Sequence, residues 1–125
     1  MKILILGDVM GASGRKAIKK NLSKIIKDNE IDFTIINGEN SADSGKGITK
    51  SIAEEFFSQG ADVITSGNHI WDQKETTDYI NKENRLLRPA NFPEDSPGKG
   101  YGIYYTKNQK FKVGVINLMG NVFMK

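Results

Sequence analysis

Residues 1–8 read MKILILGD, and this apolar run that stops at Gly7 and Asp8 decides how the rest of the chain is interpreted. A short, uninterrupted apolar segment of this kind is typical of a buried strand in a parallel sheet. The segment is too short for the core of a signal peptide or for a membrane span. We therefore expect a buried strand over residues 2–6 and a cytoplasmic protein.

The same pattern occurs twice more along the chain. Apolar runs over 31–36 and 61–65 end at the polar clusters Asn37-Gly38-Glu39-Asn40 and Ser66-Gly67-Asn68-His69. Segments with helical character lie between and after these runs, over 13–28, from Thr49 or Ser51 to Gly60, and over 73–81. Alternating strands and helices predict an α/β fold with a mostly parallel sheet and flanking helices.

The composition, with 125 residues and a net charge of +3, fits one globular domain. The helix predicted over 13–28 has an apolar face made of Ala17, Ile18, Leu22, Ile25 and Ile26. Its opposite face carries the basic residues Arg15, Lys16, Lys19, Lys20, Lys24 and Lys27. Because no aromatic residues interleave with these charges, we interpret this face as solvated and expect no stable nucleic-acid complex and no membrane contact.

The pattern changes after Arg88, where prolines and glycines predict a surface loop over 89–100. Two strands are predicted after the loop, over 101–106 and 111–118, around a turn at 107–109. These strands are expected to pair antiparallel. The apolar segment from Phe111 to Phe123 is expected to stay partly exposed and to promote association into a homo-oligomer.

Five residues with metal-binding or acid–base chemistry follow the three predicted parallel strands: Asp8, Glu39, Asn40, Asn68 and His69. The carboxyl ends of parallel strands share one edge of the sheet, so these side chains should meet there. Carboxylate, amide and imidazole groups suit manganese, iron or zinc, and no cysteine is present to bind a metal. The alternatives are a helix N-cap or turn position for Asp8, loop solvation for Glu39 and Asn40, and a core position for His69.

Common nucleotide-binding motifs do not fit the glycines of this chain. A dinucleotide fingerprint needs G-x-G-x-x-G after the first strand, whereas the glycines here are Gly7, Gly11 and Gly14. A P-loop fails as well, because Asn40 takes the place of its first glycine and Gly47 follows the lysine.

The motifs GDVMG at 7–11, NGEN at 37–40 and SGNHIWD at 66–72, in this order and spacing, resemble the calcineurin-like metallophosphoesterases. Within that superfamily the chain is most similar to the YmdB-type branch, whose members are described as 2′,3′-cyclic-nucleotide 2′-phosphodiesterases. The closing segment GVINLMGNVFM, at 114–124, resembles the same branch. The resemblance implies the N-terminal half of a metallophosphoesterase-type α/β sandwich.

The resemblance also implies a role for each candidate residue. Asp8 and Asn40 would bind one metal ion, Glu39 would bridge two ions, and Asn68 would bind the second. The ions would be divalent or trivalent, with iron or manganese favoured over zinc. His69 would protonate the leaving ribose 2′-oxygen of a cyclic nucleotide or RNA-end phosphodiester, so that the product is a nucleoside 3′-phosphate.

The chain departs from the wider superfamily in two respects. Met10 occupies the histidine position of the opening Asp-x-His pattern, as the YmdB-type branch leads one to expect. Such proteins also take further histidine ligands from a C-terminal half, including a Gly-His-x-His motif, whereas this sequence has one histidine. We therefore expect residues 1–125 to form a partial domain that is inactive alone. The alternatives are a nucleotide- or phosphate-binding module without catalysis and a purely structural α/β domain.

Overall fold

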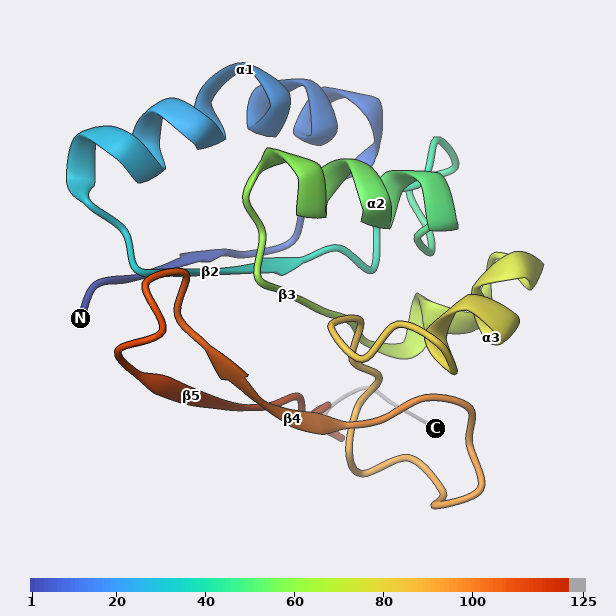
Figure 1. Cartoon of the computed structure of the whole chain (residues 1–125). Helices are drawn as coiled ribbons and strands as arrows, with labels where there is room; N and C mark the ends of the chain where they lie inside the picture. Colours follow the sequence, from blue (N-terminus) through green and yellow to red (C-terminus); the bar gives the residue numbers. More distant parts are fainter. Residues whose placement is uncertain (122–125) are drawn as a thin grey trace.

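The computed structural model describes residues 1–121 and arranges them in layers around a parallel sheet (Figure 1). The sheet contains β1 (Ile3–Leu6), β2 (Phe33–Asn37) and β3 (Val63–Thr65), in the order β1-β2-β3. A parallel bridge between Ile64 and Leu86 places the segment after residue 85 beside β3. The predicted parallel sheet is therefore confirmed.

Helices α1 (Gly11–Asn29) and α2 (Lys50–Gln59) cover one face of this sheet (Figure 1). The side chain of Thr49 caps α2 by accepting a hydrogen bond from the backbone N–H of Ile52, as expected for one of the two predicted start positions. Gly60 ends α2 at φ 118°, in the left-handed region that favours glycine. A short 3₁₀ helix, η1 (Asn68–Trp71), and α3 (Lys74–Ile80) follow β3.

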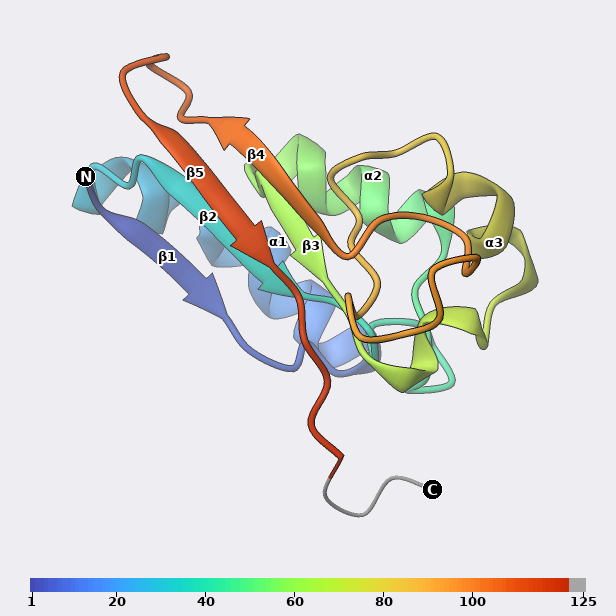
Figure 2. The same cartoon turned by 90° about the horizontal axis from the view of Figure 1, so that it is seen from below.

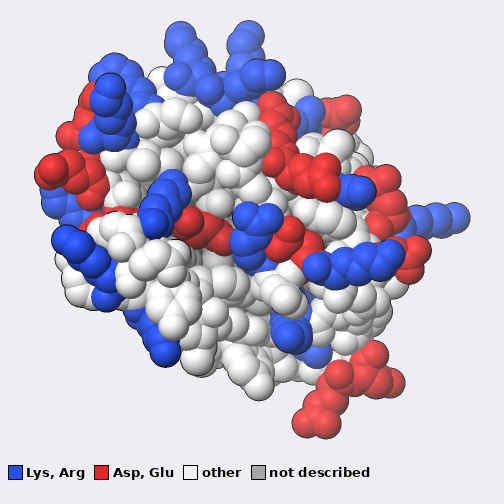
Figure 3. All heavy atoms as spheres, viewed as in Figure 1, with Lys and Arg blue, Asp and Glu red and all other residues white. Residues whose placement is uncertain are grey.

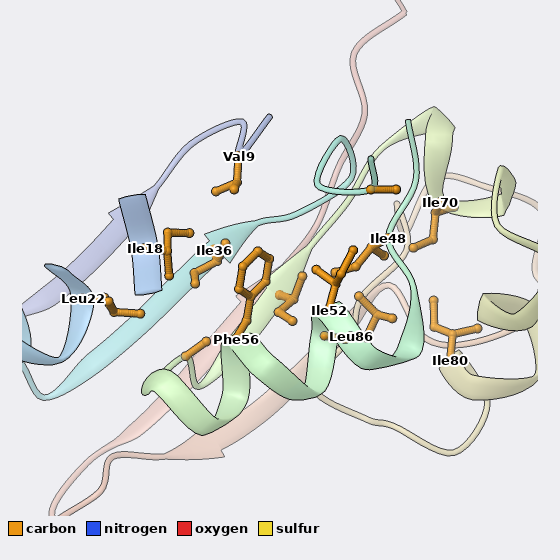
Figure 4. Packing of buried hydrophobic residues seen from close by; sticks show 14 residues of the cluster. Val9, Ile18, Leu22, Ile36, Ile48, Ile52, Phe56, Ile70, Ile80 and Leu86 are labelled. Carbon is orange, nitrogen blue, oxygen red and sulfur yellow. The ribbon is translucent and has the colours of Figure 1, made fainter. Parts of the chain in front are cut away.

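The main core lies between these helices and the sheet (Figure 4). Phe56 of α2 is fully buried and packs with Ile36 of β2 and Ile64 of β3. Ile18 and Leu22 are the buried residues of α1. Because β1, β2 and β3 run parallel, all three carboxyl ends lie at one edge of the sheet.

A β-hairpin packs against the other face of the parallel sheet (Figure 2). Its strands, β4 (Tyr101–Tyr105) and β5 (Lys112–Ile116), pair antiparallel as predicted. Val113 and Val115 face inward and pack on Phe33 of β2 and Val63 of β3. The apolar segment predicted to be exposed ends at Phe123, which lies outside the described residues.

Two sequence predictions about burial are wrong. β1 is not a buried strand, because Ile3 and Ile5 are 41% and 68% exposed. The hairpin lies over β2 and β3 and leaves this face of β1 uncovered (Figure 2). In α1, Ala17 and Ile25 are exposed rather than buried, because the residues of the predicted face that pack in the core are Ile18, Leu22 and Ile26.

The basic residues of α1 gather at the top of Figure 3, above the helix, and several pair with acids. Lys19 pairs with Glu55 of α2, and Lys24 pairs with Asp28 one turn further along α1. Such exposed pairs are typical of a solvated helix face. Each helix within residues 1–121 is too short or too polar to span a bilayer.

Candidate functional site

Asp8 and Asn40 lie in contact at the carboxyl ends of β1 and β2. The side-chain amide of Asn40 donates a hydrogen bond to Oδ1 of Asp8 at 2.7 Å. The two loops are also joined through their backbones, because Val9 N–H donates to the Asn37 carbonyl and Gly11 N–H donates to the Asn40 carbonyl. The N-cap of α1 is Met10, so the alternative role of Asp8 as a helix cap is wrong.

Glu39 points toward the end of β3, where Gly67 makes room for its carboxylate. A Cβ atom added at Gly67 would lie 2.3 Å from Oε2 of Glu39, closer than atoms can approach. The backbone N–H of His69 donates to the same oxygen at 3.5 Å. Residue 67 must therefore be glycine for the carboxylate to occupy its present position.

His69 lies in η1 and is paired with Asp72. Its Nδ1 atom is 2.8 Å from Oδ2 of Asp72, and its side chain is 28% exposed. A histidine packed in the core with backbone partners, the alternative considered from the sequence, is therefore not what the structure contains. Because Nδ1 is paired with Asp72, Nε2 is the ring nitrogen left to form a hydrogen bond with another group.

Asn68 is exposed and begins η1, directly before His69. Within residues 1–121 its side chain makes no hydrogen bond to the other four candidate residues. The structure thus joins Asp8 to Asn40 and Glu39 to His69, and the adjacent positions of Glu39 and Asn40 connect these two pairs. We call these five residues the strand-end cluster.

The end of β3 is held in place by residues that the sequence interpretation did not single out. The buried side-chain amide of Asn117, just after β5, donates to the carbonyls of Ser66 and Leu87 at 2.9 and 3.1 Å. The Ser66 hydroxyl also donates to the Leu87 carbonyl. Asp72 was overlooked too, although it closes the motif SGNHIWD and lies three residues after His69.

The donor atoms of the strand-end cluster fit part of a site for a transition-metal ion. Asp8 and Glu39 supply carboxylate oxygens, and the Asn40 amide donates through nitrogen to Asp8, so its carbonyl oxygen is available to an ion. Among residues 1–121, no group of three or more histidine, cysteine, aspartate or glutamate side chains is close enough to hold a metal ion.

The sequence model of one protein family, described as YmdB-like protein, matches residues 4–125. This chain belongs to the YmdB-like family. The match covers all three motifs around the strand-end cluster. It confirms the family predicted from those motifs.

Three relatives place the YmdB-like chain among longer proteins. A 2′,3′-cyclic-nucleotide 2′-phosphodiesterase of Bacillus subtilis (strain 168) is 48% identical over 124 residues, which are 99% of this chain and 46% of that relative. A crystal structure of a hypothetical protein from Thermus thermophilus matches this chain with a TM-score of 0.89 and 33% sequence identity. The match covers 100% of this chain and 47% of the Thermus thermophilus chain. A crystal structure of a novel phosphatase from Mycoplasma pneumoniae matches with a TM-score of 0.83 and 33% sequence identity. This match covers 96% of this chain and 43% of the phosphatase chain.

These relatives confirm the predicted fold class, an α/β fold of metallophosphoesterase type with a parallel sheet and flanking helices. The YmdB-like chain spans about half the length of the relatives it matches.

Proposed function

We propose that this chain supplies the N-terminal half of the site of a metal-dependent phosphodiesterase that hydrolyses 2′,3′-cyclic nucleotides to nucleoside 3′-phosphates. The observation that carries the proposal is that the side chains of Asp8 and Asn40 are in contact, and the Glu39 carboxylate contacts the backbone of His69, at one edge of the sheet. The similar Bacillus subtilis protein, named for this reaction, supports the choice of substrate.

Each member of the strand-end cluster has a proposed task. Asp8 and Asn40 would hold one metal ion, Glu39 would bridge to a second ion, and Asn68 would bind the second ion. Manganese suits the carboxylate and amide oxygens of these donors, and iron is the other metal that the family resemblance implies. The ions, when bound, would offset the negative charge of the phosphoryl group and activate the attacking water.

His69 is proposed as the general acid of the reaction. Asp72 accepts at Nδ1, so Nε2 is the nitrogen that, in the doubly protonated ring, would deliver a proton to the leaving ribose 2′-oxygen. The partial exposure of the ring leaves it accessible to a substrate at the sheet edge. The backbone contact of His69 with Glu39 would keep this acid beside the phosphoryl-binding position.

The proposal is tested with two proteins: the 125-residue chain, and a chimera in which this chain is followed by the part of the Bacillus subtilis relative that lies beyond the matched region. In the presence of Mn²⁺ we expect the chimera to convert 2′,3′-cyclic AMP to 3′-AMP. The 125-residue chain should show negligible turnover, since it lacks a full ligand set among its described residues. His69→Ala in the chimera should lower kcat by at least about 100-fold.

Lys110→Ala, at an exposed position in the turn of the hairpin, is the matched control and should leave the chimera's activity unchanged. Robust metal-dependent turnover by the 125-residue chain would contradict the proposal of a partial site. Full activity of the His69→Ala chimera would remove the general-acid role.

A further inference from the structure

Arg88 is a buried arginine without an acidic partner in the described part of the chain. It is 7% exposed, and its Nη1 atom donates to the Pro89 carbonyl at 2.9 Å. Its buried Nε atom has no hydrogen-bond partner. The other two arginines differ, because Arg15 pairs with Asp43 and Arg85 pairs with Glu83. Since a guanidinium group stays protonated, Arg88 is a buried positive charge with an unsatisfied donor.

Arg88 lines a hollow of about 510 Å³. The hollow lies between residues 84–88 and residues 98–104, which include most of β4. Lys99 also lines the hollow, together with Asn84 and Tyr101, and no acidic residue does. A smaller neighbouring hollow, of about 350 Å³, is lined by Arg88 and by Glu94. The larger hollow is therefore the one whose lining favours an anion.

The walls of the larger hollow are fixed by backbone contacts. Arg88 N–H donates to the Lys99 carbonyl at 3.0 Å. Gly98 adopts φ +80° and donates its N–H to the side chain of Asn81. At Gly100 an added Cβ would lie 2.2 Å from Cα of Ala90, so the two backbones are in close contact. The segments that carry Arg88 and Lys99 are thus held together by backbone contacts.

We propose that this hollow is an oxyanion-binding site for inorganic phosphate. Arg88 would donate hydrogen bonds from Nη2, which makes none within the described residues and is not among the buried unpartnered atoms, and Lys99 would contribute a second positive charge. The size of the hollow is within the range of small-molecule pockets. None of its lining residues belongs to the strand-end cluster, so the proposed site and the proposed hydrolytic site share no residue.

The test is NMR of the ¹⁵N-labelled 125-residue chain, titrated with inorganic phosphate and, separately, with acetate at matched ionic strength. With phosphate, the Nε–H signal of Arg88 and the amide signals of Lys99 and Gly100 should shift and saturate. Arg88→Met should abolish the response. Lys99→Met, a change at an exposed side chain that should not affect folding, should weaken the apparent affinity about five-fold. Lys110→Met removes the same charge elsewhere on the surface and should have no effect.

Three results would overturn the proposal. The first is the absence of a saturable shift at Arg88 and Lys99. The second is an unchanged response in the Lys99→Met variant, or equal shifts along the basic face of α1, which would indicate adventitious ion binding. The third is acetate binding as tightly as phosphate, which would mean that the hollow receives a carboxylate group instead.

Discussion

At Gly67, a Cβ atom would lie 2.3 Å from Oε2 of Glu39, so Gly67→Ala must displace that carboxylate. Because Asp8 and Glu39 are the anionic groups of the strand-end cluster, we expect the 125-residue chain to bind a single Mn²⁺ ion weakly. Gly67→Ala should weaken this binding roughly ten-fold, as expected when a ligand loses its orientation. Isothermal titration calorimetry measures the change.

Gly114→Ala is the matched control, because an added Cβ there meets nothing within 4 Å. This variant should bind Mn²⁺ like the unchanged chain. Equal Mn²⁺ affinity for the Gly67 and Gly114 variants would show that Glu39 does not take part in binding the ion.

The contact between Asp72 and His69 leads to a second prediction at the scale of single residues. An acceptor at Nδ1 stabilises the tautomer that carries its proton on Nδ1 and leaves Nε2 unprotonated. In Asp72→Ala we expect the neutral ring to shift toward the Nε2–H tautomer. Asp72→Asn, which keeps an oxygen acceptor, should preserve the original form.

Imidazole ¹⁵N chemical shifts report the tautomer directly, and His69 is the only histidine in the sequence, so its signals need no further assignment. If Asp72→Ala and the unchanged chain gave the same ¹⁵N shifts, Asp72 would have no part in orienting the ring.

At the scale of elements, Arg85 ties the segment after α3 to helix α2. It donates two hydrogen bonds to the carboxylate of Glu83, and its guanidinium lies 3.9 Å from the ring centroid of Phe57 in α2. The pairing with Arg85 lowers the pKa of Glu83, mainly through the hydrogen bonds from the Arg85 side chain. The ionised carboxylate therefore stabilises the folded state.

We expect Glu83→Gln to lower the free energy of unfolding at pH 7 by about 1 kcal/mol, a modest value because Arg85 is 45% exposed and the pair is partly screened. A lowered pKa gives a contribution that is complete above the ordinary glutamate value of 4.5 and is lost as the pH falls through the lowered value. The difference between the two proteins should thus narrow in acid. Urea unfolding at several pH values measures it, and a difference that widened as the pH fell would contradict this assignment.

At the scale of the whole molecule, the outer face of the hairpin is apolar and uncovered. Its exposed residues are Tyr101, Ile103, Tyr105, Ile116 and Leu118, of which Ile103 is 73% exposed. A contiguous apolar face of this kind favours association. We expect the 125-residue chain to form oligomers at increasing concentration, and Ile103→Lys to shift the equilibrium toward monomer.

Sedimentation velocity over a range of concentrations measures this association. Ile25→Lys is the control, because Ile25 is an exposed isoleucine on α1, on the opposite side of the parallel sheet from the hairpin. A chain that stayed monomeric at all concentrations, or a dissociating effect of Ile25→Lys equal to that of Ile103→Lys, would rule out the hairpin face as the contact.

The sequence by itself determined the order of the elements, the α/β class and the edge of the sheet that the candidate residues follow. These features follow from local patterns, since apolar runs, helical periodicity and glycines act over a few neighbouring residues. Thr49 as the cap of α2 and Gly60 as its end are examples. The direction of parallel strands then places the strand ends, and with them Asp8 and Asn40, on one side.

Only the tertiary structure decided which surfaces are covered and which side chains are paired. Ile5 is exposed because the hairpin packs on β2 and β3 and not on β1, and no property of residues 2–6 specifies that choice. Asn117 reaches the end of β3, and Arg88 becomes buried beside the loop at 98–100, through contacts between segments far apart in the sequence. Such contacts depend on the packing of layers, which acts after the local patterns have formed the elements.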